Sequence, residues 1–294
     1  MLKVLVFGGT GSQARPTVER LLHNGHKPIV LTRDPANSPE LETLGATLVA
    51  GDINDREALI SASQNVDAVA FLVPAFIGST EEAIALGKNA IDATVIGDVR
   101  RFIWNASGPI PEDVESDDPK REIFNYLKQS SLNWVIFEPT TYMENWLGPW
   151  TAPSVKNNNE LTYPVLDHVK IGWLASEDVG KLVVAAIENL NVSGHRFEIS
   201  GVEAPMGPDL ANIYSQALGR DINYRAMSPE EMGFTIDQAY GAGSGDRIAE
   251  LYRKEQADLN PEPKFHDMKK ILKLLPVEMT TIENWVRKHK QDFC

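Results

Sequence analysis

LKVLVFGGTGSQA, at residues 2–14, predicts a buried strand that runs straight into a glycine-rich turn. The run from Leu2 to Phe7 is apolar except for Lys3, and such runs are typical of strands covered on both faces of a parallel sheet. Pro16 follows where the first turn of a helix is expected, a position at which its missing N–H group costs no hydrogen bond. This opening therefore predicts a strand, a tight turn and a helix in succession.

The same alternation continues through the first half of the chain. Short apolar runs predict further strands at 28–31, 47–50, 68–73, 101–104 and 135–137. Amphipathic patterns between them predict helices from Asp55, over 81–95 and over 119–129. Because strands that alternate with helices pair in parallel through right-handed crossovers, the fold class is α/β, a Rossmann-type doubly wound parallel sheet.

The rhythm changes after Pro139, where prolines and aromatic residues cluster and strands become scarce. We therefore expect a dinucleotide-type Rossmann domain over 1–138 and a smaller mixed α/β lobe over 139–294 that holds a substrate or a partner. Residues 176–199, a helical pattern followed by a strand-like run, are expected to return to the first domain. The glycine-rich stretch 241–245 follows no predicted strand, so we expect a flexible loop there rather than a phosphate cradle.

Composition excludes several classes of protein. The 294 residues carry a net charge of -13, which is unsuited to nucleic-acid phosphates, and no apolar run approaches the length of a membrane span. The single cysteine, Cys294, allows no internal disulfide or cysteine metal cluster, and the six histidines lack metal-ligand spacing. We expect a cytoplasmic protein, monomer or homodimer, with no metal, membrane or nucleic-acid ligand.

The glycine-rich turn predicts a cofactor site. Gly8, Gly11 and Ala14 have the spacing of a loop in which the backbone approaches a diphosphate closely, with Thr10, Ser12 and Gln13 between them. The following helix would offer free N–H groups and its positive end to the phosphates. The alternative is a strand-to-helix turn in an unliganded flavodoxin-like fold.

The end of the second strand bears on which dinucleotide binds. NAD enzymes usually place a carboxylate there for the ribose 2′-hydroxyl, whereas this strand ends with Arg33 and then Asp34. A guanidinium suits a 2′-phosphate, so NADP(H) is favoured over NAD(H). Asp34 either pairs with Arg33 or caps the turn at Pro35, and Arg33 itself is alternatively a plain surface arginine.

Three further residues follow strands on the same edge. Asp52 and Ile53 come after the third strand, where adenine binds in this fold, and Asp52 either accepts from the adenine amino group or forms an Asx turn. Val73 ends the fourth strand and would line the ribose side of the cofactor, unless it is simply the exit of the strand.

Five segments carry a resemblance to a known family: VFGGTGSQA, LTRDP, GDINDREAL, PKREIFNYLKQSSLNWVIFEPTTYMENW and WLASEDVGK. Over roughly the first two hundred residues the chain resembles the NmrA-like family of atypical short-chain dehydrogenases/reductases. The resemblance implies an extended Rossmann fold that binds NADP(H) or NAD(P), in a protein that is either a working reductase or a sensor of the nicotinamide pool. It also implies that Gly8, Gly11, Ala14 and Arg33 contact the cofactor and that Lys120 reaches the nicotinamide ribose.

The catalytic residues follow the family pattern only in part. Typical short-chain reductases place a tyrosine four residues before the lysine, and Ser116 stands there instead. Tyr142, within the aromatic cluster of Met143, Asn145, Trp146 and Trp150, is a substitute proton donor, although such a cluster also suits plain core packing. Ser107 is either the catalytic serine or a turn residue, and Lys120 is alternatively a solvated lysine beside Asp117 and Asp118.

Two functions fit this pattern. The first is an NADPH-dependent reductase of a small quinone-like or carbonyl substrate, with Lys120 and Tyr142 as its catalytic residues. The second is a non-catalytic NADP(H) sensor that binds a protein partner, which the missing tyrosine favours. A dinucleotide-type scaffold without a cofactor is a third interpretation, against which the glycine-rich turn argues.

Overall fold

The computed structural model describes residues 1–73, 79–113, 117–258 and 261–294, so that Ser116 lies outside the described residues. The chain divides into two compact units. The first comprises 1–139, 176–199 and 269–278, and the second comprises 140–175, 200–268 and 279–294. Residues 269–278, which the sequence analysis placed in the lobe over 139–294, thus belong to the first unit.

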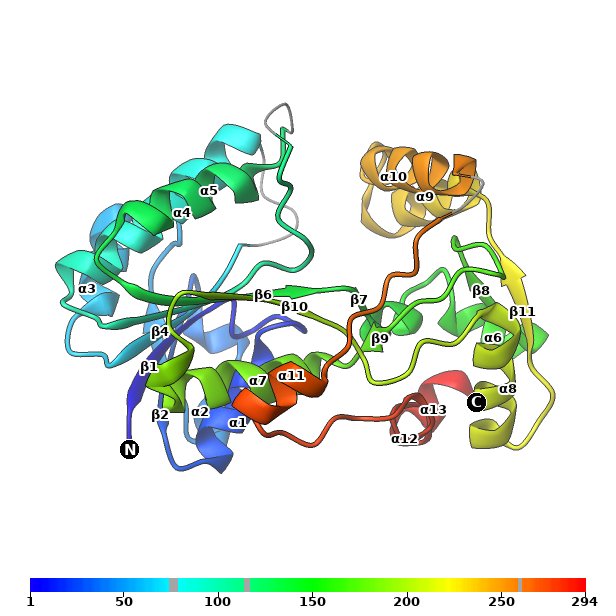
Figure 1. The fold of residues 1–294 in the computed structure, drawn as a ribbon, viewed down its shortest axis with the longest axis horizontal. Helices are drawn as coiled ribbons and strands as arrows, with labels where there is room; N and C mark the ends of the chain where they lie inside the picture. The colour runs from blue at the N-terminus through cyan, green and yellow to red at the C-terminus, as the bar shows by residue number, and fades with distance from the viewer. Residues whose placement is uncertain (74–78, 114–116, 259–260) are drawn as a thin grey trace. The chain divides into compact units, whose positions relative to one another are not determined.

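A parallel sheet of seven described strands forms the centre of the first unit (Figure 1). Its order is β10-β6-β5-β4-β1-β2-β3, and every neighbouring pair is parallel. The strands are β1 (Lys3–Phe7), β2 (Lys27–Thr32), β3 (Thr47–Ala50), β4 (Ala68–Leu72), β5 (Arg101–Asn105), β6 (Asn133–Pro139) and β10 (His195–Ile199). The predicted Rossmann-type sheet is confirmed, including its extension by the run over 195–199.

Helices cover both faces of this sheet. In Figure 1, α3, α4 and α5 lie on one face, and α1 and α7 pack together on the other. The helices of this unit are α1 (Arg15–His23), α2 (Pro39–Leu44), α3 (Arg56–Ser63), α4 (Thr80–Ile96), α5 (Pro119–Gln129), α7 (Ser176–Glu188) and α11 (Lys269–Leu274), with short 3-10 turns at Pro35–Asn37 and Leu190–Val192. The predicted helix over 119–129 has the observed bounds.

The core of the sheet explains why β1 is apolar after the exposed Lys3. Val4, Leu5 and Val6 are fully buried, and the ring of Phe7 meets Phe71 on β4 edge to face at 5.5 Å. Burial of such a strand on both faces stabilises the fold through the loss of apolar surface from water. The strand order reverses between β1 and β4, which places the switch point of the sheet at their carboxyl ends.

The second unit contains strands that the sequence analysis did not identify. β8 (Glu160–Tyr163) and β11 (Asn223–Ala226) form a parallel pair, and β7 (Thr141–Tyr142) pairs with β9 (Trp173–Leu174). Around them lie α6 (Ala152–Asn158), α8 (Gly207–Leu218), α9 (Pro229–Tyr240), α10 (Asp246–Ala257), α12 (Ile282–Lys288), α13 (Lys290–Phe293) and a 3-10 turn at Met143–Leu147. Two-residue and four-residue strands leave too short a pattern for periodicity to separate them from loops.

Aromatic rings fill the core of this unit. Trp146 is fully buried, and its ring centroid lies 4.5 Å from that of Trp173 and 5.5 Å from those of Tyr214 and Trp285. Met143 is 1 % exposed. For Trp146 and Met143 the structure therefore shows core packing, the alternative to a ligand pocket that the aromatic cluster had left open.

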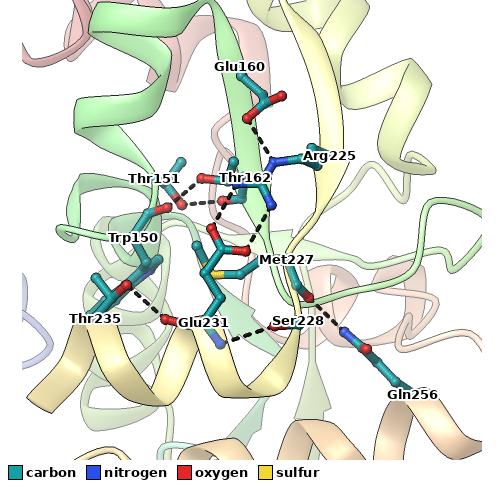
Figure 2. A network of polar contacts seen from close by, with 10 residues as sticks. All are labelled: Trp150, Thr151, Glu160, Thr162, Arg225, Met227, Ser228, Glu231, Thr235 and Gln256. Carbon is teal, nitrogen blue, oxygen red and sulfur yellow. Dashed lines mark hydrogen bonds and ion pairs between the residues drawn. The ribbon is translucent and has the colours of Figure 1, made fainter.

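An arginine ties α9 to the short parallel pair of the same unit (Figure 2). The Arg225 guanidinium donates to both carboxylate oxygens of Glu231 at 2.9 Å, and its Nε donates to Glu160 at 2.8 Å. Beside it, Thr151 Oγ1 donates to the carbonyl of Thr162 at 2.6 Å. These contacts fix the beginning of α9 against β8 and β11.

This cluster makes stability depend on pH in a defined direction. The hydrogen bonds from Arg225 lower the pKa of Glu231, so the carboxylate stabilises the folded state above the carboxyl titration range and loses that effect as the pH falls through it. We expect Glu231→Gln to lower Tm at neutral pH. The difference from the parent protein should begin to shrink below about pH 4.3, the ordinary pKa of a glutamate, and should vanish only once the pH has fallen through the lowered pKa of Glu231.

Thermal unfolding of both proteins between pH 3 and pH 8 measures this difference. Because the side chains of Arg225 and Glu231 are 41% and 40% exposed, solvent screening keeps the expected shift small. A gap in Tm that stays constant over the whole pH range would contradict the role given to the Arg225–Glu231 ion pair.

Among the described residues, none of the helices has both the length and the apolar composition that a membrane span requires.

Candidate functional site

The glycine-rich turn lies at the carboxyl end of β1, beside the switch point. Gly8 has a φ of +68°, a conformation that side chains with a Cβ rarely adopt. A Cβ on Gly9 would lie 3.0 Å from methyl groups of Val18 and Val30, so glycine permits the close packing of α1 on β2. A Cβ on Gly11 would lie 3.3 Å from the carbonyl oxygen of Gly8. The turn therefore favours glycine at each of these positions for a separate steric reason.

The residues of this turn fit a diphosphate. Among the described residues, the backbone N–H groups of Thr10, Ser12 and Gln13 have no hydrogen-bond acceptor, whereas the amides of Gly11 and Ala14 bond within the turn. Thr10 and Ser12 are exposed, and α1 follows at once. Free amides before the first turn of a helix, together with its positive dipole end, suit an anionic oxygen.

Arg33 and Asp34 follow β2 on the same edge of the sheet. Asp34 accepts the backbone N–H of Ala36 at 3.0 Å and the Asn37 side-chain amide at 3.1 Å, so it caps the turn that begins at Pro35. Of the two alternatives for Asp34, the structure thus shows the cap. Arg33 is exposed, and its guanidinium has no ion pair or hydrogen bond in the described part of the chain.

The residues after β3 and β4 complete this edge. Asp52 Oδ1 accepts the backbone N–H of Asn54 at 2.8 Å, which is the Asx turn expected as one alternative. Asp52 is exposed, and Ile53 and Val73 are half-buried. All three side chains remain predicted cofactor contacts, placed on the edge to which the glycine-rich turn belongs.

The structure joins two predicted residues that are far apart in the sequence. The Ser107 hydroxyl, just after β5, donates to the side-chain oxygen of Gln13 at 2.7 Å. Ser107 has a φ of +56°, and its backbone N–H donates to Asn105 Oδ1 at 3.0 Å. Ser107 is therefore a turn residue that also contacts the glycine-rich loop. This link was absent from the sequence analysis because the two residues are separated by 94 positions.

Lys120 lies at the beginning of α5 and is largely shielded from water. Its Nζ lies 3.1 Å from Asp118 Oδ2, its side chain is 20% exposed, and a Cβ on Gly108 would be 3.6 Å from Nζ. Lys120 is thus partly exposed and paired with one of its two neighbouring aspartates, and its contact with the nicotinamide ribose stays a prediction. Asp118 also caps α5 by accepting the Lys120 backbone N–H at 2.9 Å, a role that the sequence Asp118-Pro119 could have revealed.

Tyr142 belongs to the second unit, where its side chain is 5 % exposed. Near it in sequence, Asn145 donates to the Tyr163 hydroxyl at 3.1 Å, and Tyr252 donates to the same oxygen at 3.1 Å. Burial raises the pKa of Tyr163, so its hydroxyl stays protonated at neutral pH.

Within the described residues, no group of three or more histidine, cysteine, aspartate or glutamate side chains could hold a metal ion.

The parallel sheet, its switch point and the glycine-rich turn after β1 define a nucleotide-binding fold of the Rossmann type. The chain belongs to the NmrA-like family, whose family model matches residues 2–286. The family resemblance identified from the sequence is thereby confirmed, and it extends well beyond the two hundred residues that carried the motifs.

Three proteins to which the chain is similar are named as reductases or oxidoreductases. The chain is 27% identical to the NAD(P)H azoreductase of Xenophilus azovorans over 260 residues, which cover 85% of this chain and 86% of that protein. The triphenylmethane reductase of Citrobacter sp., complexed with NADP(H), superposes with a TM-score of 0.79 at 14% identity, covering 98% of this chain and 99% of the other. The NADPH-dependent quinone oxidoreductase of Escherichia coli, complexed with NADPH, gives 0.75 at 19%, covering 97% and 99%. At these identities the likeness to the two solved structures shows the fold alone.

Proposed function

We propose that this protein is an NADP(H)-dependent reductase of a small quinone-like or carbonyl substrate. The proposal depends chiefly on the free backbone amides of the turn after β1, which suit a diphosphate. The azoreductase and the quinone oxidoreductase to which the chain is similar are named as users of NAD(P)H and NADPH, which supports the same class of cofactor here.

The preference for NADP(H) over NAD(H) rests on Arg33. Asp34 uses both carboxylate oxygens within its own turn, so it is poorly placed to accept hydrogen bonds from a ribose 2′-hydroxyl. The guanidinium of Arg33 at the same strand end, which has no partner among the residues that the structure describes, suits a 2′-phosphate, to which it can donate two parallel hydrogen bonds.

In this proposal, residues of the first unit bind and orient the cofactor. Gly8, Gly11 and Ala14 allow the diphosphate close to the backbone. Asp52 and Ile53 lie on the adenine side of the cofactor, and Val73 lines its ribose side. Lys120 donates to the nicotinamide ribose, and Asp118 holds its ammonium group in place. The nicotinamide would supply a hydride, and reduction of a carbonyl or quinone oxygen would also consume a proton.

A non-catalytic NADP(H) sensor with a protein partner is the second candidate. The observation that favours it is Ser116, which occupies the sequence position of the usual tyrosine. Both candidates bind the cofactor through the same residues, so only turnover separates them.

Calorimetry with NADPH, followed by absorbance assays with quinones, azo dyes and aldehydes, tests the proposal. We expect saturable NADPH binding and turnover of part of this panel. Lys120→Met should lower kcat/KM about tenfold, the usual effect of losing a hydrogen bond from a charged group.

Lys128→Met is the matched control, because Lys128 is an exposed lysine at the other end of α5 whose Nζ lies over the Phe124 ring at 4.5 Å. It should leave kcat/KM unchanged. Tight NADPH binding without turnover of any compound would favour the sensor, and no binding of either dinucleotide would refute both candidates.

A further inference from the structure

An ion pair between a buried carboxylate and a partly buried guanidinium of the first unit has no role in the proposed chemistry, and the Arg196 side chain is 29% exposed. Glu138 on β6 is 3 % exposed, and its carboxylate accepts hydrogen bonds from Arg196 on β10 at 2.6 Å and 2.9 Å. Burying a charge pair is seldom the most stabilising choice, since apolar side chains of similar volume often stabilise as well or better. The pair therefore calls for an explanation other than stability.

The pair forms hydrogen bonds with both the backbone N–H and the backbone carbonyl group of Ile110, in the loop after β5. The N–H of Ile110 donates to Glu138 Oε2 at 2.7 Å, and its carbonyl oxygen accepts from Arg196 at 3.3 Å. Two apolar side chains could not make these bonds. Ile110 itself is 4 % exposed, so without the pair its N–H and carbonyl groups would be buried without these partners.

The same loop carries the contacts described for the candidate site. Three residues before Ile110, Ser107 bonds to Gln13 of the glycine-rich turn, and Gly108 lies against the Lys120 ammonium group. The Arg196 guanidinium also lies over the ring of Phe124 on α5, 4.9 Å from its centroid. The pair thus contacts both the loop and α5, the helix whose first turn contains Lys120.

We propose that Glu138 and Arg196 are positioning residues that hold the loop from Ala106 to Ile110 in place and thereby set the affinity for the dinucleotide. The part of this inference that concerns affinity rests on the proposed function. The part that concerns the loop depends only on the contacts above and can be tested without a ligand.

Hydrogen exchange of the ligand-free protein tests the loop. We expect Glu138→Gln and Arg196→Met to speed exchange of the Ser107 and Ile110 amides at least about tenfold, the usual consequence of losing a hydrogen bond to a charged group. Amides of β5 should change far less. Arg196→Lys, which keeps the charge but loses the fork that reaches Ile110, should give an intermediate rate.

Calorimetry of the same variants tests the consequence for the cofactor. We expect the Kd values for NADPH and NADH to rise by the same factor of about ten, because the loop lies away from the 2′-phosphate position. Glu188→Gln is the matched control: Glu188 accepts from His26 at 2.8 Å and from Asn24 at 3.0 Å at the amino ends of the strands. It should change neither loop exchange nor affinity.

Unchanged exchange at Ser107 and Ile110 would overturn the inference, as would an increase no larger than that of the β5 amides. Faster loop exchange with unchanged Kd values would overturn the link to the cofactor. If the parent protein binds no dinucleotide, the proposed function fails, and the exchange rates alone decide whether the pair positions the loop.

Discussion

Replacing Arg33 with alanine is expected to raise the Kd for NADPH about fiftyfold while changing the Kd for NADH less than about threefold. The Arg33 guanidinium follows β2 and is unpaired within the described ranges of the chain, and only NADPH carries a 2′-phosphate for it to bind. Isothermal titration calorimetry at a fixed, low ionic strength measures both constants, because salt would screen an exposed contact of this kind.

Two further variants sharpen this experiment. Arg33→Lys keeps the charge but not the fork, so it should weaken NADPH binding by an intermediate factor. Arg100→Ala removes another exposed arginine, directly before β5 at the amino ends of the strands, and should change neither constant. Equal losses for NADPH and NADH in Arg33→Ala would remove the reason for choosing NADP(H).

Replacing Trp146 with alanine is expected to lower the free energy of unfolding by about 3–5 kcal/mol, the usual effect of truncating a large buried aromatic side chain. Trp146 is fully buried and touches Trp173, Tyr214 and Trp285, so its removal leaves a cavity bounded by rings too large to close around it. Chemical denaturation followed by circular dichroism measures the change.

Phe234→Ala is the control within the same unit. Phe234 is 66% exposed on α9, so its truncation should change the free energy of unfolding by less than about 0.5 kcal/mol. Trp146→Phe should cost less than the alanine variant, since phenylalanine fills more of the space and lacks the indole N–H, which has no partner among the described residues. Similar midpoints for Trp146→Ala and Phe234→Ala would show that this ring cluster is not the core of the second unit.

The sequence predicted the first unit well because its signals are local. A continuous apolar run is typical of a strand buried on both faces. The glycines after it indicate a tight turn, and the structure shows Gly8 there with a φ of +68°. Asp118-Pro119 marks the beginning of α5 for equally local reasons, a capping carboxylate and a residue without an N–H. The parallel pairing of the strands follows from their alternation with helices, whereas their order in the sheet came from the structure.

Several features of the candidate site had no such local mark. The choice between a cap and an ion pair for Asp34 depended on where the Arg33 side chain points, which the neighbouring residues do not reveal. The pairing of Arg196 with Glu138 joins residues 58 positions apart, and a glutamate within a strand has the same appearance in a sequence whether it is buried or solvated.

Residues 2–14 and the strand–helix alternation after them were sufficient to predict the parallel sheet and a dinucleotide site at the first turn, since each depends on the chemistry of adjacent residues. The switch point followed only from the strand order of the folded chain. The short strands β8 and β11, the return of residues 269–278 to the first unit and the contacts of Ser107 and Ile110 emerged only from the folded chain. They depend on side chains that meet across long stretches of sequence, where packing and the pairing of buried charges, rather than local propensity, select the partner.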